Sequence, residues 1–144
     1  MPSRGKAVLV VDDDPDARAY LSTVLEDHGY EVRFACDGVE ALSRIETEVP
    51  ALITLDIAMP AKSGVAVYRA LKEDPRHRSI PVIMVTGVAD EFKRFISTRS
   101  IVPPPEGYLT KPVDADEFLR LVVALIGPGE PGDTVPRDAC GGPA

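Results

Sequence analysis

Three consecutive carboxylates, Asp12, Asp13 and Asp14, directly follow the apolar stretch at residues 8–11. Like charges at close range repel one another, and an ionised carboxylate is costly to remove from water. The three side chains therefore either point into solvent or are held together by a cation. Asp14 stands just before Pro15, which is the pattern of a helix N-cap with proline in the first turn. This leaves Asp12 and Asp13 as candidate cation ligands, or as an ordinary solvated helix entry.

Three more polar residues, Asp56, Thr86 and Lys111, follow apolar stretches later in the chain. Taken singly, each has an ordinary explanation, because loops are polar and a hydroxyl at a strand end is often satisfied by the backbone. If the apolar stretches are neighbouring strands of one parallel sheet, however, these side chains meet Asp12 and Asp13 at a single edge. A carboxylate, hydroxyl or ammonium at the end of each of these strands is hard to explain as chance.

The rest of the pattern predicts the elements that would position these residues. Short apolar stretches bounded by turn residues indicate strands, which we expect at 7–11, 31–35, 51–55, 80–85 and 107–110. Apolar residues at helical spacing indicate helices capped by Asp14, Asp37 and Asp114, and two more at about 64–73 and 89–99. Five alternating strand–helix units predict an α/β fold with a doubly wound parallel sheet. The common small version is the flavodoxin-like order 2-1-3-4-5 with five helices, in which ligands bind near the carboxyl ends of strands 1 and 3.

The composition suits one globular domain. The chain has 144 residues, 44% of them hydrophobic, and a formal net charge of −7. An acidic chain binds polyanions poorly, so nucleic acid and membrane are not expected as partners. No stretch reaches the roughly 20 apolar residues of a membrane span, and the first apolar run is too short for a signal peptide, so we expect a cytoplasmic protein. Residues 1–126 form the expected domain, and the Gly/Pro-rich residues 127–144 are expected to be a flexible tail.

Four stretches of this sequence resemble the receiver domain of two-component response regulators. They are VLVVDDDP (8–15), LITLDIAMPAKSG (52–64), PVIMVTG (81–87) and GYLTKP (107–112), and they occur in the family's order and at about its spacing. The resemblance covers about residues 6–126. It implies a domain that takes a phosphoryl group from a sensor histidine kinase.

The resemblance also implies a Mg²⁺-dependent phosphoacceptor site. Asp56 would attack the phosphorus of a phosphohistidine on the kinase. Asp13 would bind Mg²⁺ directly and Asp12 through water, while Asp56 itself and the backbone carbonyl of Ala58 would complete the protein's ligands. Mn²⁺ is expected to substitute. Elementary chemistry agrees, because Mg²⁺ prefers oxygen ligands and a carboxylate can act as nucleophile to form an aspartyl phosphate.

Further roles follow from the resemblance on the phosphoryl side of the site. Thr86 would hydrogen-bond the incoming phosphoryl group, next to Gly87, where the family usually has alanine. Lys111 would pair with a phosphoryl oxygen. Tyr108 stands at the position of the family's switch aromatic, although an aromatic residue on a strand can also be simple packing.

Two apolar side chains flank the expected phosphoryl group. The positions two past the phosphoacceptor and two past the strand-end threonine hold Ala58 and Val88. Neither side chain can orient a hydrolytic water, so we expect slow dephosphorylation. A Mg²⁺-dependent phosphohydrolase would need an acid at position 58, which argues against that class. A degenerate receiver that serves only as a scaffold is disfavoured, because all five active-site positions are filled.

The leading interpretation is a single-domain response regulator, because residues 127–144 are too few for a DNA-binding output domain. Output would run through protein–protein contacts of the face formed by the helix at 89–99, the strand at 107–110 and the last helix. SIVPPPEG (100–107), which is longer than usual in the family, adjoins this face. The downstream protein is unknown, and we expect a monomer or weak dimer. The alternative is a phosphorelay intermediate or phosphate sink that passes the group to a histidine phosphotransfer protein.

Overall fold

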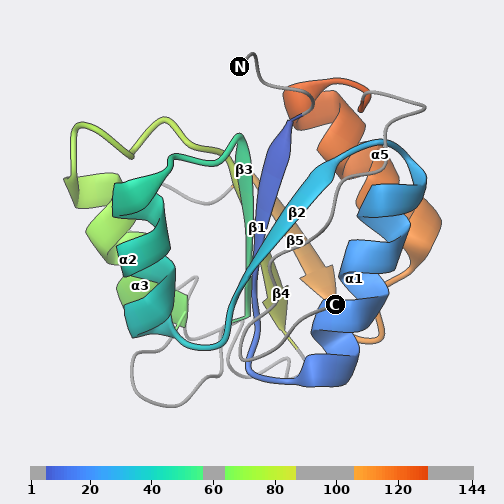
Figure 1. Ribbon diagram of the computed structural model, residues 1–144, viewed down its shortest axis with the longest axis horizontal. Helices are drawn as coiled ribbons and strands as arrows, with labels where there is room; N and C mark the ends of the chain where they lie inside the picture. The colour runs from blue at the N-terminus through green and yellow to red at the C-terminus, as the bar shows by residue number, and fades with distance from the viewer. Residues whose placement is uncertain (1–5, 57–63, 87–105, 130–144) are drawn as a thin grey trace.

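The strands form one parallel sheet with the order β2-β1-β3-β4-β5 (Figure 1). The computed structural model describes residues 6–56, 64–86 and 106–129. Within them the strands are β1 (Ala7–Val11), β2 (Glu31–Ala35), β3 (Leu52–Asp56), β4 (Val82–Thr86) and β5 (Gly107–Thr110). The predicted flavodoxin-like order 2-1-3-4-5 is confirmed.

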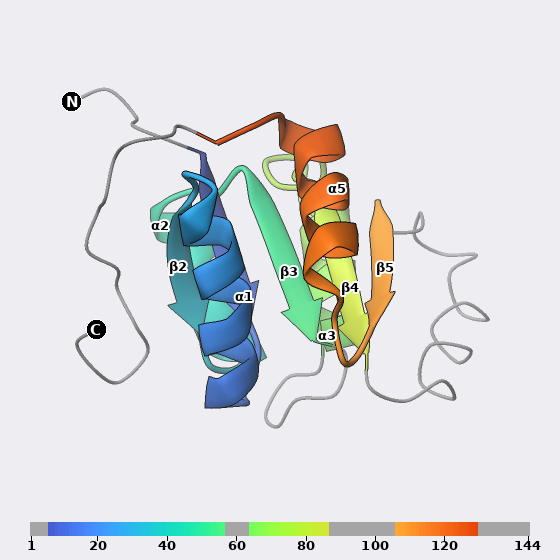
Figure 2. The ribbon, with the colours of Figure 1, turned by 90° about the vertical axis from the view of Figure 1, so that its right-hand side faces the viewer.

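Helices cover both faces of this sheet. Those in the described part of the chain are α1 (Pro15–Asp27), α2 (Gly38–Thr47), α3 (Gly64–Glu73) and α5 (Ala115–Ile126). α2 and α3 lie on one face, and α1 and α5 lie on the other (Figures 1 and 2). The helix predicted at 89–99 lies outside the described residues. None of the described helices has the length and apolar character needed to cross a membrane.

Three helices begin at the aspartates that the sequence marks as caps. The side chains of Asp14, Asp37 and Asp114 each accept a hydrogen bond from a backbone N–H two or three residues later. Each bond satisfies a donor that the first helical turn leaves unpaired. After α1 the chain turns at Gly29, whose φ of 87° favours glycine. The predicted starts of these helices are confirmed, and Asp14 is the N-cap of α1.

Buried apolar side chains fill both faces of the sheet. One cluster, on the face of α2 and α3, includes Ile45, Tyr68 and Leu71, and the other, on the face of α1 and α5, includes Leu25 and Phe118. All five residues of β3 are buried. Because the strands are parallel, their carboxyl ends meet at one edge of the sheet, where the arrowheads lie in Figure 2. Polar residues at this edge are thus carried by a rigid, close-packed core.

An ion pair between the buried Lys72 and the more exposed Glu106 ties the amino ends of β4 and β5 to α3. Lys72 is almost fully buried, and its Nζ lies 3.6 Å from an Oε of Glu106, the residue before β5. The same Nζ donates hydrogen bonds to the carbonyls of Arg78 (3.0 Å) and Ile80 (3.4 Å). Glu106 also accepts a hydrogen bond of 2.8 Å from the backbone N–H of Val82. These contacts fix the start of β5, the strand that precedes Lys111.

The residues just after α5 pack against the domain. The Tyr30 hydroxyl donates to the carbonyl of Gly127 (2.6 Å), and the Lys6 ammonium donates to the carbonyl of Pro128 (3.0 Å). A Cβ at Gly129 would lie 2.3 Å from the carbonyl oxygen of His28, so the close approach there requires glycine. Gly127 and Gly129 therefore contact the turn between α1 and β2, while Pro128 contacts Lys6 before β1.

Candidate phosphoryl and metal site

Three carboxylates converge at the carboxyl edge of β1 and β3. Asp12 follows β1 directly and Asp56 is the last residue of β3, and these two strands pair in register. Carboxylate oxygens of Asp12, Asp13 and Asp56 all lie within 4.8 Å of one another. Asp12 and Asp56 are buried, with 2% and 5% of their surface exposed, whereas Asp13 is exposed. One acid of the group is thus open to solvent while two are fixed in the protein.

Asp12 is held from four directions. Its backbone N–H donates to the carbonyl of Ala35 (3.2 Å), and its Oδ1 accepts a hydrogen bond from the backbone N–H of Asp14 (2.9 Å). Its Oδ2 lies 3.0 Å from the Nζ of Lys111, and its carbonyl accepts a hydrogen bond of 2.8 Å from Nη1 of Arg18. With both carboxylate oxygens engaged by protein donors, Asp12 is better suited to act on a cation through water than directly.

Lys111 supplies the positive charge of the group. Its Nζ lies 3.0 Å from Oδ2 of Asp12 and 3.7 Å from Oδ1 of Asp56. Partial burial lowers the pKa of this ammonium, but the hydrogen bond to Asp12 and the charges of Asp56, Asp12 and Asp14 outweigh it, so the net shift is upward. Lys111 therefore stays protonated. Three carboxylates and this one ammonium have a formal net charge of −2, without counting the Arg18 guanidinium that binds the Asp12 carbonyl.

The donor set fits a hard divalent cation. All three converging side chains offer oxygen, the ligand that Mg²⁺ and Mn²⁺ prefer, and the excess negative charge favours a doubly positive ion. Mg²⁺ usually keeps several waters and takes one or two carboxylates from the protein, which the exposed Asp13 and the neighbouring Asp56 can supply.

The other predicted site residues fall at or near the same edge, or outside the described residues. Thr86 is the last residue of β4 and is paired in register with Thr110, the residue before Lys111. Tyr108 lies on β5, half-buried against the core cluster on the face of α2 and α3. Ala58, Gly87 and Val88, together with the side chain of Thr86, are not among the parts of the chain that the structure describes.

An apolar hollow of about 320 Å³ adjoins Lys111. Its walls are formed by α1, by the end of β4 and by the segment between β5 and α5; the lining residues are Ala17, Tyr20, Leu21, Val85, Lys111, Pro112 and Val113. The Tyr20 hydroxyl donates to the carbonyl of Val113 (2.9 Å) and so joins α1 to the segment after Lys111. The Lys111–Pro112 peptide bond is cis.

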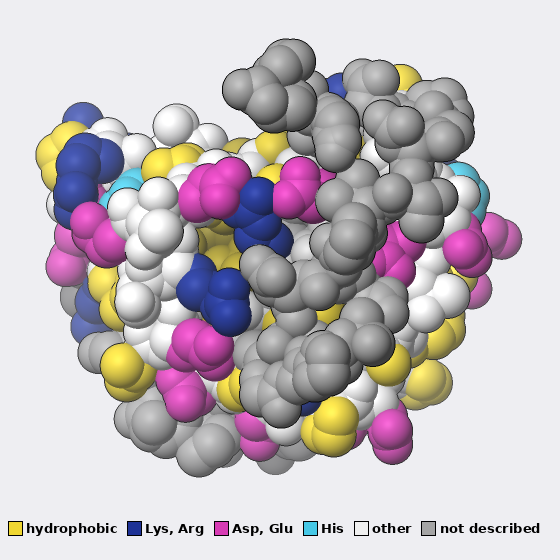
Figure 3. Space-filling view, in the orientation of Figure 1, with side chains coloured by type: hydrophobic (Ala, Val, Ile, Leu, Met, Phe, Trp, Pro, Cys, Tyr) yellow, Lys and Arg dark blue, Asp and Glu magenta, His cyan; other side chains and the backbone are white. Residues whose placement is uncertain are grey.

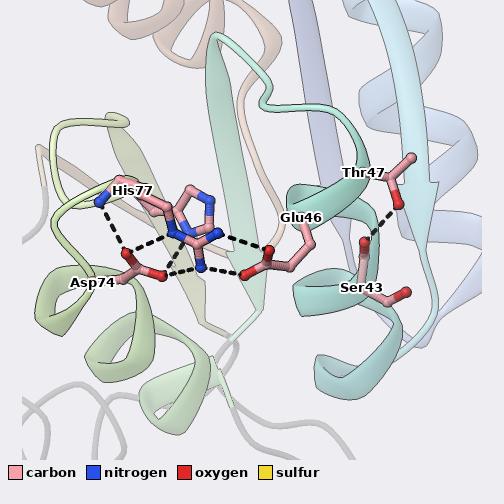
Figure 4. A network of polar contacts seen from close by, with 6 residues as sticks. Ser43, Glu46, Thr47, Asp74 and His77 are labelled. Atoms are coloured by element: carbon pink, nitrogen blue, oxygen red, sulfur yellow. Dashed lines mark hydrogen bonds and ion pairs between the residues drawn. The ribbon is translucent and has the colours of Figure 1, made fainter.

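A second group of metal-compatible side chains, Glu46, Asp74 and His77, lies between α2 and the turn after α3 (Figure 4). The guanidinium of Arg76 donates to both carboxylate oxygens of Glu46 (3.0 and 2.7 Å) and to both of Asp74 (3.2 and 2.7 Å). Nδ1 of His77 lies 3.3 Å from Oδ2 of Asp74. The Arg76 guanidinium already neutralises these carboxylates, so the group is an ion-paired link between α2 and the turn after α3.

A polar hollow of about 280 Å³ lies between the edge strand β2 and α2. Acidic and basic side chains alternate around a hollow in the space-filling view of this side of the molecule (Figure 3). The arginines that line it are already paired: Arg33 with Glu31 and Glu48, and Arg44 with Glu40. Its charges balance internally, so it offers no concentrated charge to a ligand.

Sequence reasoning did not single out Arg18. A single arginine on the second turn of a helix has no motif or periodic signal, and its contact with the Asp12 carbonyl depends on how the chain turns between β1 and α1. The only indication in the sequence was the position of Arg18, one helical turn after the cap Asp14. This position places it in the first part of the helix, the part nearest Asp12 and Asp13.

Known proteins resemble this chain over most of its length. Residues 8–123 match the family model of the response regulator receiver domain. An uncharacterised 14.6 kDa protein of Leptolyngbya boryana is 44% identical over 80% of this chain and 86% of its own length. Protein PilH of Pseudomonas aeruginosa is 34% identical over 83% of this chain and 96% of its own length, which leaves PilH no room for an output domain.

Other relatives are longer. The DNA-binding dual master transcriptional regulator RpaA of Synechocystis sp. is 36% identical over 83% of this chain, which spans only 48% of RpaA. Among solved structures, the chemotaxis protein CheY4 of Vibrio cholerae superimposes with a TM-score of 0.73 at 30% identity, covering 83% of this chain and 98% of CheY4. The family match, the relatives and the fold agree, and the chain belongs to the family of response regulator receiver domains.

Proposed function

We propose that this protein is a single-domain response regulator whose Asp56 accepts a phosphoryl group from a sensor histidine kinase in a Mg²⁺-dependent reaction. The observation that carries the proposal is the convergence of Asp12, Asp13 and Asp56 within 4.8 Å, with Lys111 in contact with two of them. The site lies at the carboxyl ends of adjacent strands, where ligands bind in folds of this kind.

In the reaction, a carboxylate oxygen of Asp56 attacks the phosphorus of the phosphohistidine. The new O–P bond forms as the N–P bond breaks, and the electron pair of that bond returns to the imidazole nitrogen of the kinase. Phosphoryl transfer asks a protein mainly for positioning and charge neutralisation. Asp13, Asp56 and the carbonyl of Ala58 would hold Mg²⁺, with Asp12 acting through water, and the bound ion would supply part of that neutralisation.

The remaining residues act on the phosphoryl oxygens. Lys111, whose Nζ is 3.7 Å from Oδ1 of Asp56, is close enough to pair with a phosphoryl oxygen bound there. The Thr86 hydroxyl donates a second hydrogen bond and moves toward the phosphoryl group. Tyr108 would then turn further into the core, and this local charge event would change the face that β5 and α5 are expected to form with the helix predicted at 89–99. A downstream protein that recognises this face receives the signal.

The kinase contacts the surface beside Lys111, where the 320 Å³ hollow presents apolar side chains of α1 and of the segment before α5. A side chain from the phosphodonor protein can bury itself there while the phosphohistidine reaches Asp56. Tyr20→Asp should slow transfer from a purified sensor kinase but not from acetyl phosphate. Equal slowing with both donors would place the effect in the site and not in docking.

Phosphorylation with acetyl phosphate tests the central proposal. With Mg²⁺ present, the wild-type protein should gain one phosphoryl group in an intact-mass measurement, and Asp56→Asn should gain none. Peptide mapping should place the group on Asp56. A group mapped to Asp12, Asp13 or a hydroxyl would overturn the proposal.

The phosphorylated state should last long, because Ala58 and Val88 offer no polar group to orient the hydrolytic water. The double variant Ala58→Asn, Val88→Glu should shorten its lifetime when decay is followed in excess Mg²⁺ without a phosphatase. Wild-type decay as fast as that of the double variant would show that other groups orient the water.

A further inference from the structure

Arg18 hydrogen-bonds the residues on both sides of Asp13. Its backbone N–H donates to the carbonyl of Asp14 (3.1 Å), and its Nη1 reaches back to the carbonyl of Asp12 (2.8 Å). Arg18 is half-buried, which limits the freedom of its side chain. The residues before and after Asp13 are thus both held by the same arginine.

Holding the Asp12 carbonyl has a direct effect on Asp13. The peptide bond between the two residues is planar, so fixing its carbonyl oxygen fixes the amide of Asp13 and restricts the direction in which the Asp13 side chain leaves the backbone. Asp13 is exposed, and packing gives its carboxylate little restraint. A backbone restraint is therefore the main means by which this carboxylate can be kept facing Asp12 and Asp56.

We infer that Arg18 is a positioning residue of the metal site: by holding the Asp12 carbonyl, its guanidinium orients Asp13 and raises the affinity for a divalent cation. The inference rests on the proposed function, since it assumes that Asp13 is a metal ligand. It assigns to Arg18 no contact with the metal or with the phosphoryl group.

The charge of Arg18 allows a sharp test, because charge and positioning act in opposite directions. A positive group near the site repels a divalent cation, so removing the charge alone should tighten metal binding. Loss of positioning should weaken it. Changes to residues that orient metal ligands typically reduce metal affinity by about 10- to 100-fold, and we expect a loss near the lower end of that range.

The experiment compares Mn²⁺ binding, measured by electron paramagnetic resonance of the free ion, in the wild-type protein, Arg18→Met and Arg44→Met. Arg44 is the matched control: like Arg18 it lies on a helix, but its guanidinium pairs with Glu40, and among the described residues it has no contact with Asp12, Asp13, Asp56 or Lys111. Circular dichroism checks folding, and Arg18→Gln replaces Arg18→Met if the latter does not fold. We expect about tenfold weaker binding for Arg18→Met and no change for Arg44→Met.

The Mg²⁺ dependence of phosphorylation by acetyl phosphate supplies a second readout. Arg18→Met should need about tenfold more Mg²⁺ for half-maximal rate yet approach the wild-type rate at saturating Mg²⁺. Unchanged or tighter metal binding in Arg18→Met would overturn the inference. Asp13→Asn distinguishes failure of the metal site from failure of the Arg18 role. If Asp13→Asn binds Mn²⁺ like the wild type, the proposed metal site is wrong. If Asp13→Asn loses binding while Arg18→Met binds normally, only the role of Arg18 is refuted.

Discussion

Two groups of side chains in the described part of this domain could hold a metal ion by residue type and distance, and they differ in how their charges are paired. In each group the ligand atoms lie within 4.8 Å of one another. Asp12, Asp13 and Asp56 share one ammonium, that of Lys111, which contacts two of them. In the other group the planar guanidinium of Arg76 binds both oxygens of Glu46 and both of Asp74.

The difference lies in what remains after internal pairing. A guanidinium matches carboxylates through paired hydrogen bonds, whereas an ammonium is a compact point charge. The three carboxylates of the first group and Lys111 have a formal net charge of −2, and two of these carboxylates are buried. The second is solvent-exposed at Arg76 and Glu46, with 63% and 52% of their side chains accessible. The charge left after internal pairing, and not the number of acids, is thus the feature that favours Asp12, Asp13 and Asp56 as the candidate metal site.

The largest expected difference between the two groups is in phosphorylation. Asp13→Asn should abolish Mg²⁺-dependent phosphorylation by acetyl phosphate, because it removes the exposed ligand of the cation. Asp74→Asn, a matched change of one aspartate in the other group, should react at the wild-type rate. Both are followed by intact mass over time. A normal rate in Asp13→Asn would end the assignment of the first group as the metal site.

A smaller effect is expected on thermal stability in the presence of Mg²⁺. A ligand that binds only the folded state at ten times its dissociation constant stabilises it by about 1.4 kcal/mol. Wild type and Glu46→Gln should gain this increment equally, and Asp13→Asn should gain none. Unfolding is followed by circular dichroism with Mg²⁺ or with a chelator. If the increment disappeared in Glu46→Gln instead, the second group would be the cation site.

Pattern and spacing in the sequence were enough to predict the strands and the capped helices, because these rest on local chemistry. The sheet order could be predicted because alternating strand–helix units with right-handed crossovers have few common arrangements. The ends of two strands differ by one or two residues from the prediction: β3 is Leu52–Asp56 against 51–55, and β4 is Val82–Thr86 against 80–85. Pro81 lacks the N–H that a ladder needs. At the carboxyl end of β3 the pairing with β4 continues through Asp56, which is paired with Val85. The candidate nucleophile is thus part of the sheet and not of the loop after it.

Contacts that depend on packing between distant residues could not be predicted in this way. Glu46 and Arg76 are 30 positions apart and meet only because α2 and α3 pack side by side. The Arg18 contact depends on the turn between β1 and α1. Acids that follow strands, in contrast, share an edge in any parallel sheet, which is why the convergence of Asp12, Asp13 and Asp56 could be anticipated.

A third prediction concerns stability without metal, where the same kind of change should have opposite signs in the two groups. Asp13→Asn removes one of three like charges that share one cation, so the free energy of unfolding should rise, by about 0.5 kcal/mol. Glu46→Gln removes a paired partner of Arg76, so the free energy of unfolding should fall slightly. Urea unfolding in the presence of a chelator measures both. A rise in both variants would mean that the second group is also under charge repulsion.

The smallest expected effect is on the pH dependence of stability, where the two groups should respond at opposite ends of the scale. Hydrogen bonds from Arg76 lower the pKa of Asp74 to about 2. A lowered pKa means that the stabilisation is present above the unfolded value of about 3.9 and is lost as the pH falls through about 2. The stability gap between wild type and Asp74→Asn should therefore narrow between about pH 4 and 2.

The pKa of Lys111 is raised, so the contribution of this ammonium to the free energy of unfolding is complete below the unfolded value of about 10.4. That contribution is lost as the pH rises through the higher folded value. The gap between wild type and Lys111→Met should accordingly stay constant from neutral pH to about 10 and narrow only above it. Urea unfolding across this pH range measures both gaps. A Lys111 gap that closed near neutral pH would mean that the ammonium loses its proton inside the acidic group, and the charge count on which the comparison of the two groups rests would be wrong.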